Sequence, residues 1–177
     1  TGGIDLIFPH HENEIAQSEA STKKKFANYW FHNEHLLVNG QKMSKSLGNF
    51  FTLRDLLSKG YNPKAIRYLL LSAHYRVQLN FTEEAVKAAD NAVQRLNDFI
   101  IRLKEIKKET KFVLLHDPIG KVKSKFESAM DDDLNISSAL AYIFDFIREI
   151  NTLIMENKLG KKDAKKIINF MNDIDKI

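Results

Sequence analysis

The sequence predicts an α/β part followed by an all-α antiparallel helical bundle. Three observations lead to this fold class. A short apolar run at residues 4–8 is followed at once by a helical pattern, and a strand followed directly by a helix is the unit of a parallel α/β sheet. Glycine, asparagine and proline then divide residues 39–63 into short segments. From residue 82 onward, apolar residues recur every three or four positions, as in amphipathic helices.

The first element is expected to be a buried strand at residues 4–8, preceded by two glycines. Pro9 fits the first turn of a helix, because the N–H group that proline lacks would have no intrahelical partner there. That helix would extend to about Ser21, with Ile15 and Ala16 on its buried side. Ligands bind at the carboxyl ends of the strands in parallel sheets, which is where the two histidines after Pro9 would lie.

The next strand is expected at Leu36–Val38, and it leads into a turn at Asn39-Gly40. The stretch KMSKSLGN, residues 42–49, then forms a loop with glycines near both ends.

Two helix starts follow, each marked by a capping residue. Thr52 is the first, and Asp55 three residues later completes a capping box. Asn62 is the second, and the helix opened by Pro63 is predicted to continue to about Ala73.

Residues 82–177 are predicted to form an antiparallel helical bundle. Narrow apolar seams indicate two long helices, and two shorter helices and a loop complete the bundle. The seams contain Val86, Ala89, Val93, Leu96, Ile100 and Leu103 in the first helix, and Ile136, Leu140, Ile143, Phe144, Ile147, Ile150 and Ile154 in the second. The shorter helices are expected at residues 122–130 and 164–171, and the loop at residues 116–120.

Composition is ordinary for a soluble protein. The 177 residues are 44% hydrophobic and 28% charged, and no apolar run reaches the ~20 residues that a membrane span needs. The chain contains no cysteine, which excludes disulfides and a thiolate metal site built from these residues alone. A cytoplasmic protein without membrane association is therefore expected. The net charge of +4 mildly favours a polyanionic partner such as RNA, although a lysine-rich surface explains the same value.

The stretch FPHHENEIAQSEA places two histidines and two glutamates within five residues. His10 and Glu14 are four residues apart and would share one face of a helix, and His11 is three residues from Glu14 and could also converge on it. A histidine and a carboxylate on one face can supply half of a tetrahedral zinc site. A surface ion pair or a helix cap explains the same spacing.

The stretch KMSKS places Lys42 and Lys45 three residues apart, among Ser44 and Ser46. Lysine can meet a phosphate without demanding a fixed geometry, and serine hydroxyls and loop N–H groups add donors. Such a loop suits a reaction in which pyrophosphate leaves a nucleotide. A solvated charged turn is the alternative.

Taken together, these stretches resemble class I aminoacyl-tRNA synthetases. KMSKSLGN is similar to their second signature, and GGIDLIFPHHENEIAQSEA resembles the cysteine-specific members. The resemblance continues through YWFHNEHLLVNGQKMSKSLGNFFTLRDLL and IRYLLLSAHYRVQLNFTEEAV, and AMDDDLNISSAL resembles the helical anticodon-binding bundle. It implies three parts: the second half of a Rossmann-like catalytic domain at residues 1–40, the KMSKS loop with a connecting helical segment at 41–81, and the anticodon-binding bundle at 82–177.

The resemblance implies an ATP-dependent ligase, expected to be a monomer, that activates L-cysteine as an adenylate and transfers it to cysteine tRNA. ATP would be a substrate together with Mg²⁺. One Zn²⁺ per intact enzyme would select the substrate thiol over the hydroxyl of serine. The chain begins at Thr1, within a strand pattern, so we expect a fragment that is inactive alone. The first signature of the family would lie upstream, and a further small C-terminal domain would follow.

The family's zinc-binding histidine and glutamate map onto His10 and Glu14, and its other two ligands, both cysteines, are expected upstream of this chain. Asp5 matches an acidic position near the adenylate's ribose or the substrate amine. Trp30 and His32 could border the nucleotide. The sequence departs from the family pattern at Glu34, where glycine is expected.

By the same resemblance, Lys45 corresponds to the lysine that contacts ATP, and Lys42 assists it in catalysis. Ser44 and Ser46 are expected to take part in ATP binding.

Several cationic side chains are candidates for contact with the tRNA backbone, although lysines on a solvated helix face are an equal alternative. They are Arg67, Arg76, Lys158, Lys161, Lys162, Lys165 and Lys166. Two other functions remain open. One is the related ligase that joins cysteine to an amino-sugar, which needs no anticodon-binding bundle. The other is a non-enzymatic tRNA-binding helical module.

Overall fold

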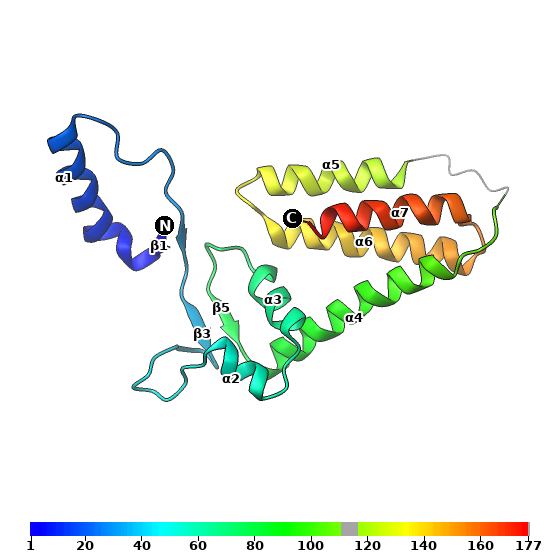
Figure 1. Ribbon diagram of the computed structural model, residues 1–177, viewed down its shortest axis with the longest axis horizontal. Helices are drawn as coiled ribbons and strands as arrows, with labels where there is room; N and C mark the ends of the chain where they lie inside the picture. Colours follow the sequence, from blue (N-terminus) through cyan, green and yellow to red (C-terminus); the bar gives the residue numbers. More distant parts are fainter. Residues whose placement is uncertain (111–116, 177) are drawn as a thin grey trace.

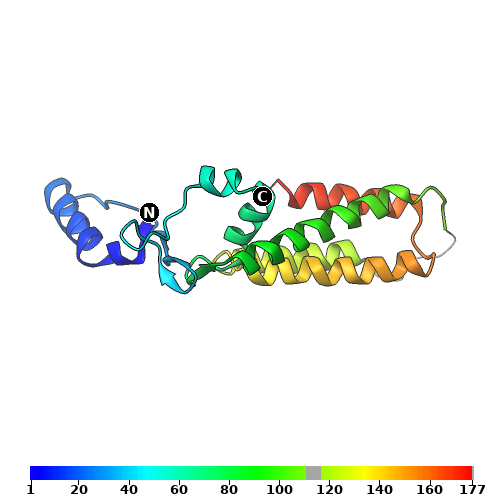
Figure 2. The ribbon, with the colours of Figure 1, turned by 90° about the horizontal axis from the view of Figure 1, so that it is seen from below.

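The computed structural model describes residues 1–110 and 117–176. Small strands and short helices occupy one end of an elongated molecule, and a bundle of long helices occupies the other (Figures 1 and 2). This arrangement confirms the predicted order of an α/β part followed by a helical bundle. Helix α4, Glu83–Glu105, runs obliquely from the first part into the second. No helix in the described ranges has the length and apolar character that crossing a membrane requires.

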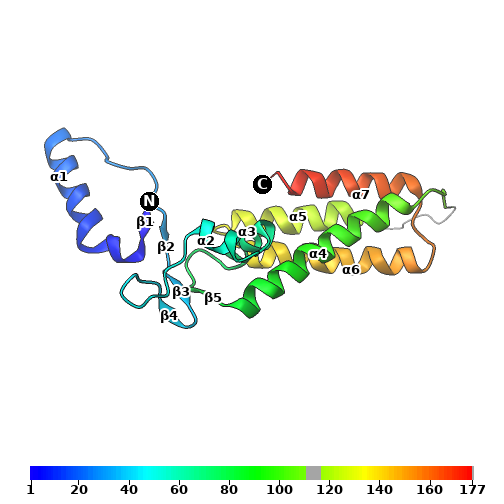
Figure 3. The same cartoon turned by 60° about the horizontal axis from the view of Figure 1, so that its bottom comes forward.

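The strands form two small sheets (Figure 3). Strand β1, Gly2–Gly3, pairs in parallel with β2, His32–Asn33. Strand β3, Leu36–Val38, lies between β4, Gln41–Lys42, which is antiparallel to it, and β5, Leu79–Phe81, which is parallel.

The turn between β3 and β4 confirms the sequence expectation. Asn39 and Gly40 have φ angles of 50° and 75°, which is the conformation that a two-residue hairpin needs.

The predicted strand at residues 4–8 is wrong. Parallel pairing occurs at Gly2–Gly3 instead, Ile4–Leu6 forms a 3-10 turn, and Ile7–His11 forms a π-type turn that is interrupted at Phe8. Apolar composition favours a strand only when burial rewards it, and Phe8 is 77% exposed. Phe8 itself is extended, with φ −129° and ψ 132°, as residues before proline usually are.

Helix α1, Glu12–Thr22, also differs from the expectation. It begins three residues after Pro9, so Pro9 does not open it. None of its residues is buried: Ile15 is partly buried and Ala16 is exposed. The predicted buried side is therefore wrong, and Figure 1 shows α1 projecting away from the rest of the molecule. Apolar residues at helical spacing do not bury a face when no other element lies against it.

Both predicted capped helices are present. Helix α2, Leu53–Ser58, starts with a complete capping box between Thr52 and Asp55. Helix α3, Pro63–Ser72, starts at Asn62, whose side chain accepts a hydrogen bond from the N–H of Lys64. These helices pack with β3, β5 and the start of α4 around a small core that contains Val38, Leu56, Ala65, Ile66, Leu69, Phe81, Val86 and Ala89.

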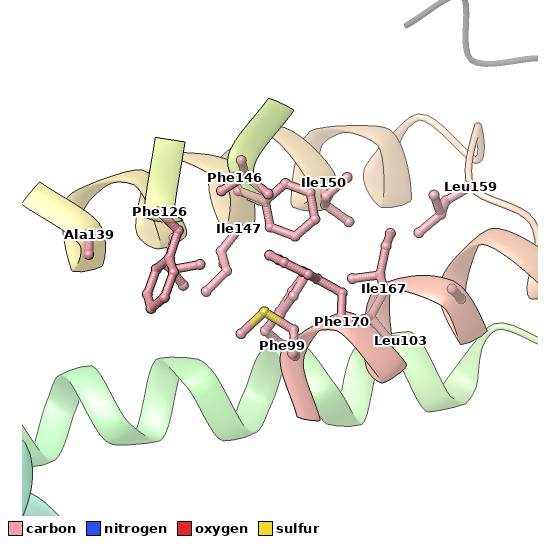
Figure 4. Packing of buried hydrophobic residues seen from close by; sticks show 14 of the residues in the cluster. Phe99, Leu103, Phe126, Ala139, Phe146, Ile147, Ile150, Leu159, Ile167 and Phe170 are labelled. Atoms are coloured by element: carbon pink, nitrogen blue, oxygen red, sulfur yellow. The ribbon is translucent and has the colours of Figure 1, made fainter. Parts of the chain in front are cut away.

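The second core lies in the bundle. Helix α4 is followed by α5, Pro118–Asp131, α6, Ile136–Met155, and α7, Lys161–Ile174, and successive helices run in opposite directions (Figure 1). Their apolar seams meet around Phe99, Phe146 and Phe170 (Figure 4). The ring of Phe146 makes edge contacts with those of both other phenylalanines.

The bundle helices are longer than predicted at their ends. The expected loop at residues 116–120 is wrong from Pro118 onward, because α5 begins there with proline in its first turn. His116 lies outside the described residues. The helix predicted at 164–171 likewise extends over Lys161–Ile174.

Candidate functional site

The structure brings His10, His11 and Glu14 together. The Nε2 atom of His10 lies 3.6 Å from Oε1 of Glu14, and Nε2 of His11 lies 3.9 Å from Oε2 of the same carboxylate. Both histidines belong to the turn that leads into α1, and Glu14 is in the first turn of that helix. The spacing of three and four residues therefore places them on one side of the chain, as the sequence predicted.

The two histidines differ in their surroundings. The side chain of His10 is 61% exposed, whereas that of His11 is 9% exposed. Nδ1 of His11 lies 2.7 Å from Nε2 of His32 on β2, so one ring nitrogen donates a hydrogen bond to the other. The ring of His11 also packs against that of Trp30, with centroids 4.8 Å apart. His11 is thus fixed in place, and His10 stays open to solvent.

His32 favours its neutral form. The pKa of His32 is lowered, first by partial burial and then by the charge of His11. A lowered pKa means that the protonated form of His32 is disfavoured, so this ring is neutral near neutral pH. Trp30 stacks parallel to His32. Trp30 and His32 therefore support the histidine cluster directly.

The cluster has the geometry of half a zinc site. One ligand atom from each of His10, His11 and Glu14 lies within 4.8 Å of the others. Zinc–nitrogen and zinc–oxygen bonds of about 2.0–2.1 Å place neighbouring ligands of a tetrahedron roughly 3.4 Å apart, and the His10–Glu14 distance of 3.6 Å is close to that value. Imidazole and carboxylate are both zinc ligands. The donor set therefore fits zinc, and a tetrahedral site would need further ligands.

Asp5 follows β1, at the carboxyl end of the parallel strand pair. Its Oδ1 atom lies 3.9 Å from Nε2 of His35, which follows β2 at the same end. A Cβ atom at Gly3 would meet Oδ1 of Asp5, so a larger residue there would displace this exposed carboxylate. Sequence reasoning missed His35. The structure brings His35 to Asp5 because His35 follows β2, and β2 pairs in parallel with the two glycines before Asp5.

The residue Glu34 does not need to be glycine. Its φ is not positive, its N–H donates to the carbonyl of Tyr75, and its carboxylate accepts from the N–H of His35. The departure from the expected pattern therefore leaves the backbone at this position unstrained.

The lysine–serine loop is closed by one residue that sequence reasoning did not single out. The side chain of Asn49 accepts from the N–H of Ser44 at 2.8 Å and donates to the carbonyl of Lys42 at 3.2 Å. Within the loop, the hydroxyls of Ser44 and Ser46 are 3.2 Å apart, and Gly48 has a φ of 66°. An asparagine directly after a glycine at the end of a loop was the available signal.

Lys42 and Lys45 are both exposed, and the ammonium of Lys45 lies 5.6 Å from the centre of the Phe50 ring. The loop and the histidine cluster are separate in this structure. Figure 1 shows the loop projecting below β3, whereas the turn that carries the histidines lies beside β1 at the other end of the strands. The sequence-predicted residues therefore form two groups.

Among the cationic candidates for RNA contact, some side chains are exposed and others form ion pairs. Arg67 is exposed, but Arg76 binds Asp133 through Nε at 2.6 Å. Lys161, Lys162, Lys165 and Lys166 are exposed along the start of α7, while Lys158 pairs with Glu156. The N–H of Lys161 donates to the carbonyl of Lys108, which places the segment after α4 beside this basic surface.

Family comparisons match both parts of the chain. The model of the family described as "tRNA synthetases class I (C) catalytic domain" matches residues 1–91, and the DALR domain matches residues 125–177.

Curated relatives match nearly the whole chain. A cysteine–tRNA ligase of Protochlamydia amoebophila is 54% identical over 99% of this chain and 37% of its own length. The corresponding ligase of Chlamydia muridarum is 50% identical over 99% of this chain and 39% of its own length, and that of Brachyspira hyodysenteriae is 47% identical over 100% and 38%. The chain thus spans about two-fifths of the length of these relatives.

A solved structure shares the fold. It is a LeuRS of Agrobacterium radiobacter K84 in a ternary complex with tRNA and LeuAMS, with a TM-score of 0.64 over 92% of this chain and 23% of that one. Its sequence identity of 16% supports a shared fold and nothing more. Because the family match extends over more than half of the chain, through both groups of candidate residues, the chain belongs to the tRNA synthetases of class I, with the catalytic domain of the (C) type.

Proposed function

We propose that this chain is part of a cysteine–tRNA ligase. The observation that carries the proposal is the identity of 54% and 50% to two such ligases over 99% of the chain, which includes both the histidine cluster and the lysine–serine loop. The activity belongs to the full-length protein, because the chain spans 37% and 39% of those relatives. In this proposal residues 1–40 belong to the Rossmann-like catalytic domain, 41–81 carry the loop and its connecting helices, and 82–177 form the tRNA-binding bundle.

The first reaction joins cysteine to the adenylyl group of ATP. The carboxylate of cysteine attacks the α-phosphorus of ATP, a P–O bond forms, and pyrophosphate leaves. Lys45 and Lys42 are exposed ammonium groups on a glycine-containing loop, so they can meet the charge that grows on the leaving phosphates. Asn49 keeps the loop closed from within, which orients the two lysines before the nucleotide arrives.

Other polar groups have supporting roles. The hydroxyls of Ser44 and Ser46 face each other within the loop and are available to phosphate oxygens. Asp5 keeps an exposed carboxylate at the carboxyl end of the strand pair, where it can accept a hydrogen bond from a ribose hydroxyl or from the substrate amine. Mg²⁺ would accompany the nucleotide.

The histidine cluster would hold zinc. His10 and Glu14 are the proposed ligands from this chain, and two cysteines from outside it would complete the site. Bound zinc would bind the thiolate of cysteine more strongly than the hydroxyl of serine. His11 is held by His32 at 2.7 Å and is largely buried, so its role is to orient the cluster beneath His10.

The second reaction transfers cysteine to tRNA. The cysteinyl group passes from the adenylate to a hydroxyl of the terminal adenosine, and AMP leaves. The proposal gives the bundle the task of holding the tRNA, because its exposed lysines on α7 form a surface suited to a phosphate backbone. The amino-sugar ligase is not favoured, since the DALR match covers residues 125–177 and that enzyme needs no such bundle. A non-enzymatic RNA-binding module is not favoured either, because the relatives are ligases.

Cysteine-dependent ATP–pyrophosphate exchange in the full-length protein tests the proposal. We expect exchange with cysteine and little with serine, and Lys45→Ala should lower the rate about 100-fold, as loss of one preorganised charged donor does. Lys64→Ala removes an exposed lysine from the first turn of α3 and should leave the rate unchanged. Binding of cysteine tRNA without any exchange would instead support the non-enzymatic module.

Zinc content tests the metal ligands separately. His10→Ala in the full-length protein should lower bound zinc to well below one ion per chain, measured by atomic emission, because loss of a direct ligand weakens the site. His11→Gln should reduce zinc less, since His11 is assigned a supporting role. Full zinc retention in His10→Ala, with loss in His11→Gln, would reverse the assignment.

A further inference from the structure

Asp133 lies in the turn between α5 and α6 and is held by three consecutive residues from another region. The hydroxyl of Tyr75 donates to its Oδ1 atom at 2.5 Å. Arg76 donates from Nε to Oδ2 at 2.6 Å and from Nη2 to Oδ1 at 3.4 Å. The ring Nε2 of His74 lies 2.8 Å from the carbonyl oxygen of Asp133. We call these four residues, His74, Tyr75, Arg76 and Asp133, the Asp133 latch.

The other side of Tyr75 contacts the strand pair that carries the histidine cluster. Its ring stacks on that of Phe31, with centroids 4.2 Å apart. Its carbonyl accepts from the N–H of Glu34 at 2.9 Å. Phe31 and Glu34 flank β2, which contributes His32 to the cluster. Tyr75 therefore lies between the bundle and the candidate site, in contact with both.

Two residues of the α5–α6 turn have a left-handed backbone conformation, which indicates that their surroundings hold them in place. Asp133 and Leu134 have φ angles of 53° and 58°, and a left-handed conformation persists in such residues only when the surroundings determine it. The hydrogen bond from Arg76, and next that from Tyr75, holds the pKa of Asp133 below its usual range. The carboxylate is therefore ionised at neutral pH, and its bonds are charge-assisted.

The latch is one of two kinds of connection between the regions. Helix α4 passes continuously from the small core into the bundle core, with Val86 and Ala89 in the first and Phe99 and Leu103 in the second. A single helix fixes the distance between the two cores but does not prevent one core from bending or rotating relative to the other. The Asp133 latch and the hydrogen bond from Ser137 Oγ to the carbonyl of Ser72 form a second connection between the two regions. Figure 1 shows the α5–α6 turn beside the segment that follows α3.

We propose that Tyr75, Arg76 and Asp133 are positioning residues that hold the helical bundle in a fixed orientation against the strand pair of the candidate site. The inference rests on the proposed function. In a tRNA ligase, the bundle must hold the tRNA so that its terminal adenosine reaches the activated amino acid. The latch is therefore required for transfer to tRNA and not for formation of the adenylate, which involves no tRNA.

The test separates the two reactions in the full-length protein. Asp133→Asn suits the site, because asparagine also tolerates a positive φ but carries no charge for Arg76. We expect ATP–pyrophosphate exchange within twofold of the unchanged protein and a fall of at least tenfold in kcat/KM for tRNA in aminoacylation. Asp133→Glu, which keeps the charge, should recover part of that loss. Tyr75→Phe should act in the same direction, and adding it to Asp133→Asn should cause little further loss.

Asp131→Asn is the matched control, because it removes one exposed carboxylate from the end of α5, only two residues away. It should leave both reactions unchanged. Equal losses in exchange and transfer for both Asp133→Asn and Tyr75→Phe would show a merely structural role and overturn the inference. Unchanged transfer in both variants would overturn it as well.

Hydrogen exchange gives a readout that does not depend on activity. If the latch orders the junction, Asp133→Asn should speed amide exchange at least fivefold in segments 31–36 and 72–78, and leave α7 unchanged. Asp131→Asn should alter neither segment. A protein without cysteine-dependent exchange of pyrophosphate would refute the proposed function, whereas unaltered amide exchange in Asp133→Asn would refute the latch alone.

Discussion

The bundle and the region that carries the candidate site use their apolar side chains differently. The four largest fully buried side chains among the described residues, Phe99, Leu103, Ile150 and Ile167, all belong to the bundle. Around the histidine cluster, Phe8 is 77% exposed and Tyr29 is 94% exposed, and no residue of α1 is buried.

The bundle therefore contributes mainly to stability, and the site region contributes the groups that can take part in chemistry. The bundle encloses most of its large apolar groups in one core, so its stability comes from packing. The site region keeps imidazole, carboxylate and ammonium groups within reach of solvent, and it is ordered by a few polar contacts such as His11–His32 and the Asn49 closure of the loop. Exposed aromatic groups beside a site are also surfaces that another part of a longer protein can cover.

The largest expected effect is the difference in stability loss when a phenylalanine is replaced by alanine in each of the two regions. Phe99→Ala should lower the free energy of unfolding by about 3–5 kcal/mol, because it leaves a cavity in a closed core. Phe8→Ala should change it by no more than about 0.5 kcal/mol, since that ring is mostly exposed. Urea denaturation followed by circular dichroism measures both. Similar losses in the two variants would break the comparison.

A smaller effect is expected from the helix caps. Thr82 caps α4, which enters both cores, and Thr52 caps the six-residue helix α2. Thr82→Ala should cost about 1 kcal/mol of global stability. Thr52→Ala should instead speed amide exchange within α2 and leave the global urea midpoint nearly unchanged, because α2 has only one buried residue, Leu56. A shift of the global midpoint by Thr52→Ala would show that α2 unfolds together with the bundle.

The smallest effect is expected from lowering the pH, which should weaken local structure at two carboxyl groups. Hydrogen bonds from Thr52 hold the pKa of Asp55 below its usual value, and those from Arg76 and Tyr75 do so for Asp133. A carboxyl whose pKa is depressed in the folded state contributes stability above its unfolded pKa of about 4 and loses it as pH falls through the folded pKa. The protection of amides in α2 and at the latch, taken as the exchange rate of the unstructured chain relative to their own at the same pH, should therefore fall below about pH 4.

The bundle supplies the internal control for the acid experiment. None of the buried residues described in its core around Phe99, Phe146 and Phe170 carries a carboxyl or an imidazole group, so the protection of amides within α6 and α7 should change little over the same range. Asp55→Asn should remove the pH dependence of α2 and leave that of the latch intact. Loss of protection in all helices at one pH would contradict the separation between the regions.

Much of the fold could be predicted from the sequence, because it follows from local patterns. The caps at Thr52 and Asn62, the Asn39-Gly40 turn and the long helices of the bundle all depend on residues within a few positions of each other. The convergence of His10 and Glu14 is local in the same sense, since helical spacing alone places them together.

Only the tertiary structure decided which segments lie against which. Residues 4–8 look like a buried strand by composition, but pairing occurs at Gly2–Gly3 and the apolar run stays largely exposed. The contact of His11 with His32 joins residues 21 positions apart, and those of Asp133 with Tyr75 and Arg76 join residues 58 and 57 positions apart. Local propensity encodes helices, turns and caps, whereas a contact over such separations depends on how whole elements pack, which no short stretch of sequence specifies.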